Sequence, residues 1–173
     1  SVGFISQVER GLTAPSLGSL VSISKVLGLP LSSMLAQPHN SEETTRQSVR
    51  ATYQVPGASL SYERLSTSFS GSSLHSVIVH EPPGHRAEPI SHEGEEMFFL
   101  LAGSITVEIE GDVQVLNQGD SIHFDSRRVH STWNHTAQTA SILWCGTMNV
   151  FDDAPAPIHN SPLDQPEGKT PTT

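Results

Sequence analysis

The sequence predicts a mainly β protein with a small α-helical part at its N-terminus. Apolar residues recur at helical spacing over roughly the first forty residues, and from about residue 58 they recur at every second residue. Turn sequences such as Gly111-Asp112 and Gly119-Asp120 separate the short β runs. Many short strands with turns between them are typical of an all-β sandwich or barrel.

The N-terminal part predicts two short helices. The first follows a cap at Ser1 and ends at Gly11, and the second follows a cap at Ser16 and ends at Gly28 and Pro30. Their apolar residues fall on one face of each helix: Val2, Ile5 and Val8 in the first, and Leu17, Leu20, Val21, Val26 and Leu27 in the second. Two such helices are expected to pack as a small hairpin.

The remaining chain predicts seven strands, which we place at 60–65, 74–80, 97–101, 105–109, 113–115, 122–124 and 141–145. The polar stretch before them has no sustained apolar spacing and indicates a linker. We therefore divide the chain into a helical part at 1–36, a linker at 37–57, a β domain at 58–150 and a flexible tail at 151–173.

Composition restricts the class of protein. The chain has 173 residues, no run of about eighteen apolar residues that could cross a membrane, and one cysteine, Cys145. It begins at Ser1 without methionine and without a signal-peptide pattern, so we expect an N-terminally truncated fragment of a cytoplasmic protein. We expect no membrane partner.

The charge is distributed unevenly. The formal net charge is −9, whereas residues 1–40 carry only Glu9, Arg10 and Lys25, a net charge of +1. Phosphate binding depends on Lys and Arg, so contact with nucleic acid is expected from the N-terminal part alone. The acidic remainder leaves room for a cationic small ligand, and the alternative is an ordinary solvated acidic surface.

The segments Phe4-Ile-Ser-Gln-Val-Glu-Arg-Gly-Leu-Thr-Ala-Pro-Ser16 and Lys25-Val-Leu-Gly-Leu-Pro-Leu-Ser-Ser-Met-Leu35 resemble the second half of a phage-repressor-type (XRE) helix-turn-helix domain. The resemblance implies that the first helix lies in the major groove of operator DNA, held to its domain by Ile5 and Val8. The implied contacts are Gly3, Ser6 and Gln7 to base edges, and Arg10, Thr13 and the amide groups at Ser16 to phosphates. The alternative is a solvated helix face, and the family's first two helices would precede Ser1.

Two imidazoles and one carboxylate form a potential metal-ligand set. His92 and Glu96 are four residues apart just before a strand, and His130 follows about thirty residues later. A folded β domain can bring the three side chains together. Such a set suits Zn, Fe, Ni or Mn better than Ca or Mg.

The same residues carry a resemblance to the cupin superfamily over roughly residues 58–150. His92, Glu96 and Gly103 fall on the spacing of the first cupin motif, and Gly119-Asp120, His130 and Asn134 fall on that of the second. The resemblance implies a double-stranded β-helix (jelly-roll) barrel that holds one divalent metal through His92, Glu96 and His130.

One cupin ligand is missing, because Ile90 stands at the place of the family's first His. The three remaining ligands still form a facial triad with open coordination positions. His85 is a candidate substitute ligand, and the alternative is an empty site.

An effector pocket is expected at the mouth of the barrel. Arg127 could pair there with the carboxylate of a small effector, with Phe98 and Trp133 as pocket wall. Ordinary surface charge is the alternative for Arg127. We expect His123 to lie on the surface or on the other face of its sheet.

Two functions from different classes fit these residues. The first is a bacterial DNA-binding regulator, acting as a homodimer, whose cupin domain senses an amino acid, peptide or polyamine. The second is a non-haem Fe(II) oxidase or epoxidase that uses the His-Glu-His triad. The epoxidases that this combination of domains resembles act on hydroxypropylphosphonate. We favour the regulator, because the sequence carries no added cluster of Lys and Tyr residues suited to holding such a phosphonate. A metal-free cupin used only for dimerisation is a third alternative.

Overall fold

The structure is a computed structural model that describes most of the chain. The described residues are 2–10, 12–13, 15–29, 43–50, 52–54, 60–67, 69, 71–148 and 150. The expected tail at 151–173 lies outside them, as do residues 37–42, 51 and 55–57 of the expected linker and residues 58–59 at the start of the expected β domain.

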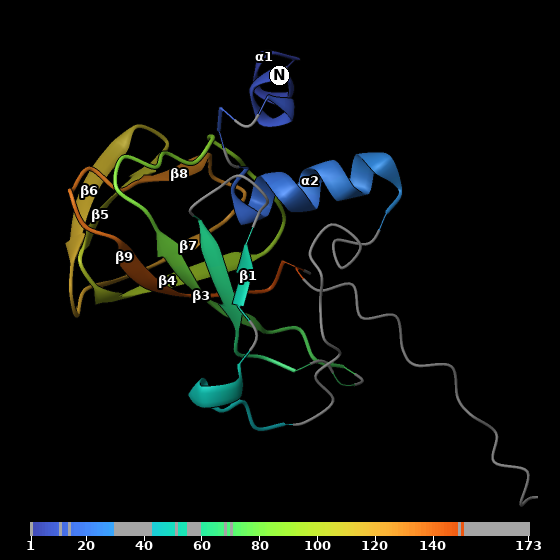
Figure 1. Ribbon diagram of the computed structural model, residues 1–173, viewed down its shortest axis with the longest axis vertical. Coiled ribbons are helices and arrows are strands. Elements are labelled where there is room, and N and C mark those ends of the chain that lie inside the picture. Colours follow the sequence, from blue (N-terminus) through green and yellow to red (C-terminus); the bar gives the residue numbers. More distant parts are fainter. Residues whose placement is uncertain are drawn as a thin grey trace, which may run out of the picture.

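The described strands form two antiparallel sheets that face each other (Figure 1). They are β1 (Thr52–Gln54), β2 (Ser61–Arg64), β3 (His75–Glu81), β4 (Glu95–Ala102), β5 (Ser104–Ile109), β6 (Asp112–Asn117), β7 (Ser121–Asp125), β8 (His130–Trp133) and β9 (Ala140–Gly146). The larger sheet has the order β1-β2-β3-β9-β4-β7, and the smaller one has the order β6-β5-β8. The mainly β fold predicted from the period-two spacing is confirmed.

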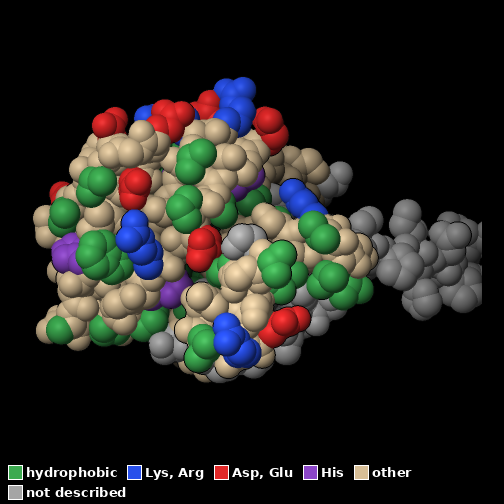
Figure 2. All heavy atoms as spheres, turned by 90° about the horizontal axis from the view of Figure 1, so that it is seen from above, with side chains coloured by type: hydrophobic (Ala, Val, Ile, Leu, Met, Phe, Trp, Pro, Cys, Tyr) green, Lys and Arg blue, Asp and Glu red, His purple; other side chains and the backbone are tan. Residues whose placement is uncertain are grey.

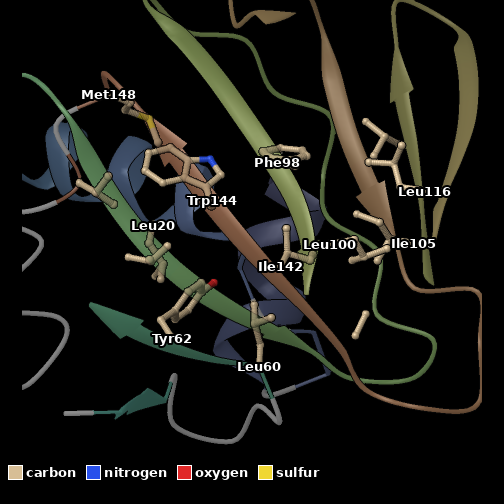
Figure 3. Packing of buried hydrophobic residues seen from close by; sticks show 14 of the residues in the cluster. Leu20, Leu60, Tyr62, Phe98, Leu100, Ile105, Leu116, Ile142, Trp144 and Met148 are labelled. Carbon is tan, nitrogen blue, oxygen red and sulfur yellow. The ribbon is translucent and has the colours of Figure 1, made fainter. Parts of the chain in front are cut away.

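The core lies between the two sheets, where alternate side chains of each strand point inward. In β4, Phe98 and Leu100 are buried, while Phe99 and Leu101 on the other face are each 37% exposed. Inward residues of β5 such as Ile105 belong to the same buried cluster (Figure 3). The alternation seen in the sequence therefore corresponds to one buried face and one exposed face.

Gly103 allows the chain to turn from β4 into β5. Its φ is +81°, a left-handed conformation that other residues rarely adopt, and an added Cβ would lie 3.0 Å from Cα of Ala140. Any larger side chain would therefore meet both backbone strain and a neighbouring strand. This gives the glycine at the end of the first cupin motif a physical reason.

The second helix, α2 (Leu17–Leu27), packs against the barrel. The hydroxyl of Ser16 accepts a hydrogen bond from the amide of Ser19, and Gly28 ends the helix at a φ of 64°, as the sequence predicts. Leu20 and Val21 are buried in the same cluster as the strands of the barrel. The helical part and the β part thus share one core.

The first helix, α1 (Val2–Glu9), lies beyond α2 and apart from the strands (Figure 1). It has no buried residue, and Ile5, which the resemblance implies to hold the helix to its domain, is 40% exposed. Val8, the other residue implied to hold the helix, is half-buried. This differs from the expected packing.

The β structure begins earlier than residue 58. A short 3₁₀ helix, η1 (Gln47–Val49), and strand β1 both lie in the range expected to be a linker, and β1 pairs with β2. Arg50 and His80 both contact the carboxylate of Glu63, at 2.9 and 2.7 Å. Pairing with β2, the buried ring of Tyr53 and the Arg50 ion pair join this segment to the barrel. A three-residue strand with one buried side chain gives no periodic apolar pattern, so hydrophobic spacing alone does not reveal it.

Substitution of two neighbouring leucines tests the alternation of buried and exposed side chains along β4. We expect Leu100→Ala to lower the free energy of unfolding by roughly 2 to 5 kcal/mol, because it leaves a cavity at a position that is 0% exposed. Leu101→Ala is the matched control and should cost less than about 1 kcal/mol. Urea unfolding of both variants measures the difference. Equal losses would show that the two faces of β4 are not distinguished as described.

Candidate metal centre

Three side chains from three parts of the fold meet between the sheets. Glu96 points inward from β4, and His130 is the first residue of β8, paired with Ile109 of β5. His92 precedes β4, and its amide donates a hydrogen bond of 2.9 Å to the carbonyl of Ser126. One ligand atom from each of His92, Glu96 and His130 lies within 4.8 Å of the other two.

Backbone carbonyls fix the tautomer of both imidazoles in their neutral form. Nδ1 of His130 is 2.8 Å from the carbonyl oxygen of Arg128, and Nδ1 of His92 is 3.1 Å from that of Glu93. A carbonyl oxygen only accepts hydrogen bonds, so each Nδ1 carries the proton. In the neutral rings, each Nε2 is then left with a free lone pair.

Both free lone pairs face the same carboxylate. Nε2 of His92 lies 2.9 Å from Oε1 of Glu96, and Nε2 of His130 lies 3.5 Å from Oε2. His130 Nε2 is buried and has no hydrogen-bond partner among the described residues. Two imidazole lone pairs and a carboxylate converge on one point, which requires a cation or a proton between them. The donor set therefore fits a divalent transition metal.

Burial of Glu96 and His130 makes a positive charge between the three side chains more favourable still. Glu96 and His130 are buried, and the Phe124 ring packs against His130 with the ring centroids 5.0 Å apart. Burial acts to lower the pKa of His92, but its hydrogen bond to Glu96 and the charge of that carboxylate outweigh burial and raise the pKa. A proton on His92 thus partly supplies the charge that a metal would bring.

The place of the missing cupin ligand is filled by a side chain with a packing role. Ile90 exchanges two backbone hydrogen bonds of 2.9 Å with His130, and its side chain contacts Gly18 of α2. His85, the candidate substitute ligand, lines a cavity inside the barrel, and burial lowers its pKa. It does not belong to the group of converging ligands found among the described residues. The His-Glu-His group therefore remains open on one side.

That open side faces a cavity of about 90 Å³. Glu96 and His130 form part of its wall, and Ser16 and Gly18 at the start of α2 also line it. Its apolar wall includes Val79. Figure 3 labels further apolar side chains of this wall: Leu60, Phe98, Ile142, Trp144 and Met148. A mostly apolar cavity with a few convergent polar groups is the usual form of a small-molecule site.

Glu81 forms a second polar centre in the cavity, which the sequence did not lead us to expect. Glu81 is only 2% exposed, and it accepts hydrogen bonds from the backbone amide of Asn134, at 3.1 Å, and from the Thr132 hydroxyl. Burial raises the pKa of Glu81 to about 7. The signal was present in the sequence, because Glu81 continues the inward alternation of Val77 and Val79.

The residues expected in the effector pocket do not all meet. Phe98 lines the cavity. Trp133 is 41% exposed and stacks against Arg86 at 5.7 Å, and Arg127 pairs with Asp125; neither belongs to the described lining of the cavity. The exposed imidazole of His123 pairs with Glu95 at 3.0 Å, so His123 lies on the surface.

The residues expected to contact DNA lie on and after α1. Gly3, Gln7 and Arg10 are exposed, whereas Ser6 and Thr13 are half-buried. Arg10 donates a hydrogen bond of 3.0 Å to the carbonyl oxygen of Ser6 within the helix. Ser16 caps α2 and lines the barrel cavity, so its surroundings differ from those of the exposed residues of α1.

The pKa of Glu81 gives a stability prediction. The raised value means that the unfolded chain releases this proton at lower pH than the native protein, so the native state loses stability as pH rises from about 4.5 to about 7. We expect Glu81→Gln, which cannot ionise, to gain roughly 2 kcal/mol in free energy of unfolding over wild type between pH 5 and pH 8. Denaturant unfolding at both pH values measures this gain.

The control for Glu81→Gln is Glu88→Gln, an exposed glutamate on the rim of the same cavity. It should change stability equally at both pH values. A gain for Glu81→Gln that does not depend on pH would contradict the raised pKa.

Comparison with known proteins gives the fold a name. Residues 77–146 match the Cupin_2 family, described as a cupin domain. A cupin of the RmlC-like type from Shewanella frigidimarina superposes with a TM-score of 0.55 at 16% identity, covering 64% of this chain and 94% of that one. KdgF from a Halomonas species gives a TM-score of 0.53 at 18% identity, covering 62% and 94%.

A longer similarity includes the helical part. The HTH-type transcriptional regulator PuuR of Escherichia coli K12 is 25% identical over 149 residues, which are 85% of this chain and 80% of the relative, and the Shigella flexneri protein of the same name matches equally. The β part of the chain therefore has the cupin fold, and residues 77–146 match a cupin domain, in a chain that is similar over most of its length to a transcriptional regulator.

Proposed function

We propose that this protein is a DNA-binding transcriptional regulator whose cupin domain senses a small metabolite of the amino acid, peptide or polyamine class. One observation carries the proposal. The start of α2, which resembles part of a helix-turn-helix domain, lines the same cavity as Glu96 and His130. A molecule bound in the cavity therefore contacts the helical part directly.

The contact between α2 and the barrel supplies a mechanism for regulation. Ser16 and Gly18 lie at the cavity, while Leu20 and Val21 are buried in the shared core. A ligand that binds more tightly to one arrangement of α2 than to another shifts the balance between them by that difference in affinity. The exposed Gln7 of α1 and Arg10 just after it, seven to ten residues before α2, would then present a different surface to operator DNA.

The partners follow from the same proposal. Operator half-sites lie about one helical turn apart, so the regulator acts as a homodimer. No helix among the described residues is long and apolar enough to cross a membrane, and a cytoplasmic location accompanies the proposed function. Figure 2 looks onto the end that carries α1 and shows acidic and basic side chains interspersed, which leaves DNA contact to local residues rather than to a broad basic surface.

The proposed regulator holds a divalent transition metal (Zn, Fe, Ni or Mn) through His92, Glu96 and His130. Such a metal would supply a Lewis-acidic centre at the wall of the cavity. The backbone carbonyls of Glu93 and Arg128 keep each Nε2 free to bind it. The alternative of an empty site used only in a dimerisation module is tested by the same experiment as metal binding.

A second candidate function is a non-haem Fe(II) oxidase or epoxidase. The observation that favours it is the open side of the His-Glu-His group toward the cavity, since a facial triad leaves positions for both oxygen and substrate. Oxygen consumption by the Fe(II)-loaded protein with candidate substrates separates the two functions. The regulator proposal expects none above the background rate.

Metal binding gives the first prediction of the proposal. Wild-type protein purified without chelators should contain close to one equivalent of transition metal, and His130→Ala should lower the affinity by about tenfold or more, because one of three ligands is lost. His123→Ala is the control, since His123 is exposed and pairs with Glu95 outside the centre. Elemental analysis and Co(II) titration measure both. Metal-free wild type, or unchanged affinity in His130→Ala, would reject the site.

DNA binding gives the second prediction. The full-length protein should retard its own upstream DNA at low salt, and Gln7→Ala should weaken specific binding by roughly 1 to 3 kcal/mol through loss of a base-edge contact. Gln114→Ala, at an exposed position of β6, is the control and should bind as wild type does. Gel retardation with specific and scrambled DNA measures the effect. Failure of the full-length protein to bind any upstream DNA would remove the regulator proposal.

A further inference from the structure

The charges that line the cavity all have one sign. Its described lining contains three carboxylates, Glu81, Glu88 and Glu96, and no Lys or Arg. Glu96 is taken up by the two histidines of the metal centre, whereas Glu81 lies outside that group. Because the described lining holds no Lys or Arg, the ionised form of Glu81 has no permanently charged cation beside it in this apolar cavity. A cationic ligand would supply the missing charge.

Glu81 retains capacity to accept hydrogen bonds. It accepts one from the amide of Asn134 and one from the Thr132 hydroxyl, whereas a carboxylate offers about four lone-pair positions. The Asn134 side chain also donates to the backbone carbonyl of Glu81, at 2.8 Å, and this fixes the end of β3. The carboxylate is therefore held in place and still has acceptor positions for a ligand.

The Tyr62 hydroxyl is the second unused polar group of the cavity. Tyr62 lies on β2 and pairs with Val79 of the neighbouring strand β3. Glu81 follows Val79 by two residues on β3, so both side chains lie on the same face of that strand. Tyr62 is buried, and its oxygen has no hydrogen-bond partner among the described residues. Burial raises the pKa of Tyr62 far above its usual range, and the charge of Glu81 adds a smaller increase, so the hydroxyl stays neutral. A buried hydroxyl without a partner is costly unless a ligand pairs with it.

We propose that Glu81 and the hydroxyl of Tyr62 form a subsite that binds the protonated amino group of a small aliphatic amine in the barrel cavity. An ammonium group has three N–H donors, which the carboxylate and the phenol oxygen can accept together. The aliphatic part of the amine lies along Val79, Ile142 and Met148, and the Trp144 ring adds an aromatic wall to the cavity.

An amine fits these groups better than a neutral or an anionic ligand. An alcohol would pair with the two oxygens but would leave the charge of Glu81 uncompensated, and a carboxylate would add a second negative charge beside it. The inference rests on the proposed function only in taking the cavity as the effector site. It does not require DNA binding, so the two are tested separately.

The test is calorimetric titration of the purified full-length protein with n-pentylamine and with its neutral counterpart n-pentanol. We expect wild type to bind the amine at least tenfold more tightly than the alcohol. Glu81→Gln keeps the shape and should lower amine affinity at least tenfold, while affinity for the alcohol changes less than threefold. Tyr62→Phe should lower amine affinity by a smaller factor of about three to ten, as expected for one lost hydrogen bond.

Asp112→Asn is the matched control, because it removes a carboxylate at an exposed position of β6, outside the described lining of the cavity, and should leave amine affinity within twofold of wild type. Amine binding unchanged in Glu81→Gln, equal affinity of wild type for amine and alcohol, or no detectable amine binding would each overturn the subsite. Amine binding by a protein that fails to bind DNA would support the subsite and remove the regulator proposal instead.

Discussion

The register of β4 between its two neighbours is the constraint on which the rest of the structure depends. Glu96 pairs with Gly146 of β9 and Phe124 of β7, and the next inward residues of the same strand, Phe98 and Leu100, form the core. A shift of the strand by one residue would turn these three side chains outward and would point Met97 and Phe99 into the interior instead. One set of backbone hydrogen bonds thus orients both the core and the carboxylate of the metal centre.

The interior of the barrel holds two acidic centres with different partners. Glu96 meets two imidazole lone pairs, while Glu81 meets an amide, a hydroxyl and the nearby phenol of Tyr62. Both carboxylates are buried, so each depends on a positive charge or on hydrogen-bond donors that the fold must provide. The start of α2 lines this acidic, largely apolar cavity, and Gly18 allows the helix to approach Ile90 closely. A ligand in the cavity would therefore contact the helix directly.

Much of the fold could be predicted from the sequence, because the period of apolar residues and the turn glycines are local signals. The change of period near residue 58 revealed the β domain, and the cap at Ser16 with Gly28 revealed α2. Strand β1 and helix η1 were missed, because one buried side chain, Tyr53, and the Arg50–Glu63 ion pair leave no periodic apolar pattern. The residues of the potential metal group were found by spacing, since ligands on adjacent inward positions keep a fixed separation along the chain.

The sequence by itself determined the β class of the domain, the ends of α2 and the identity of the three converging side chains. Only the tertiary structure decided that both Nε2 atoms face Glu96, that Arg127 and Trp133 lie outside the cavity lining, and that Glu81 and Tyr62 lie within it. The reason is physical: spacing specifies which face of a strand a side chain occupies, whereas burial, charge compensation and hydrogen-bond partners depend on strands that are far apart in the chain.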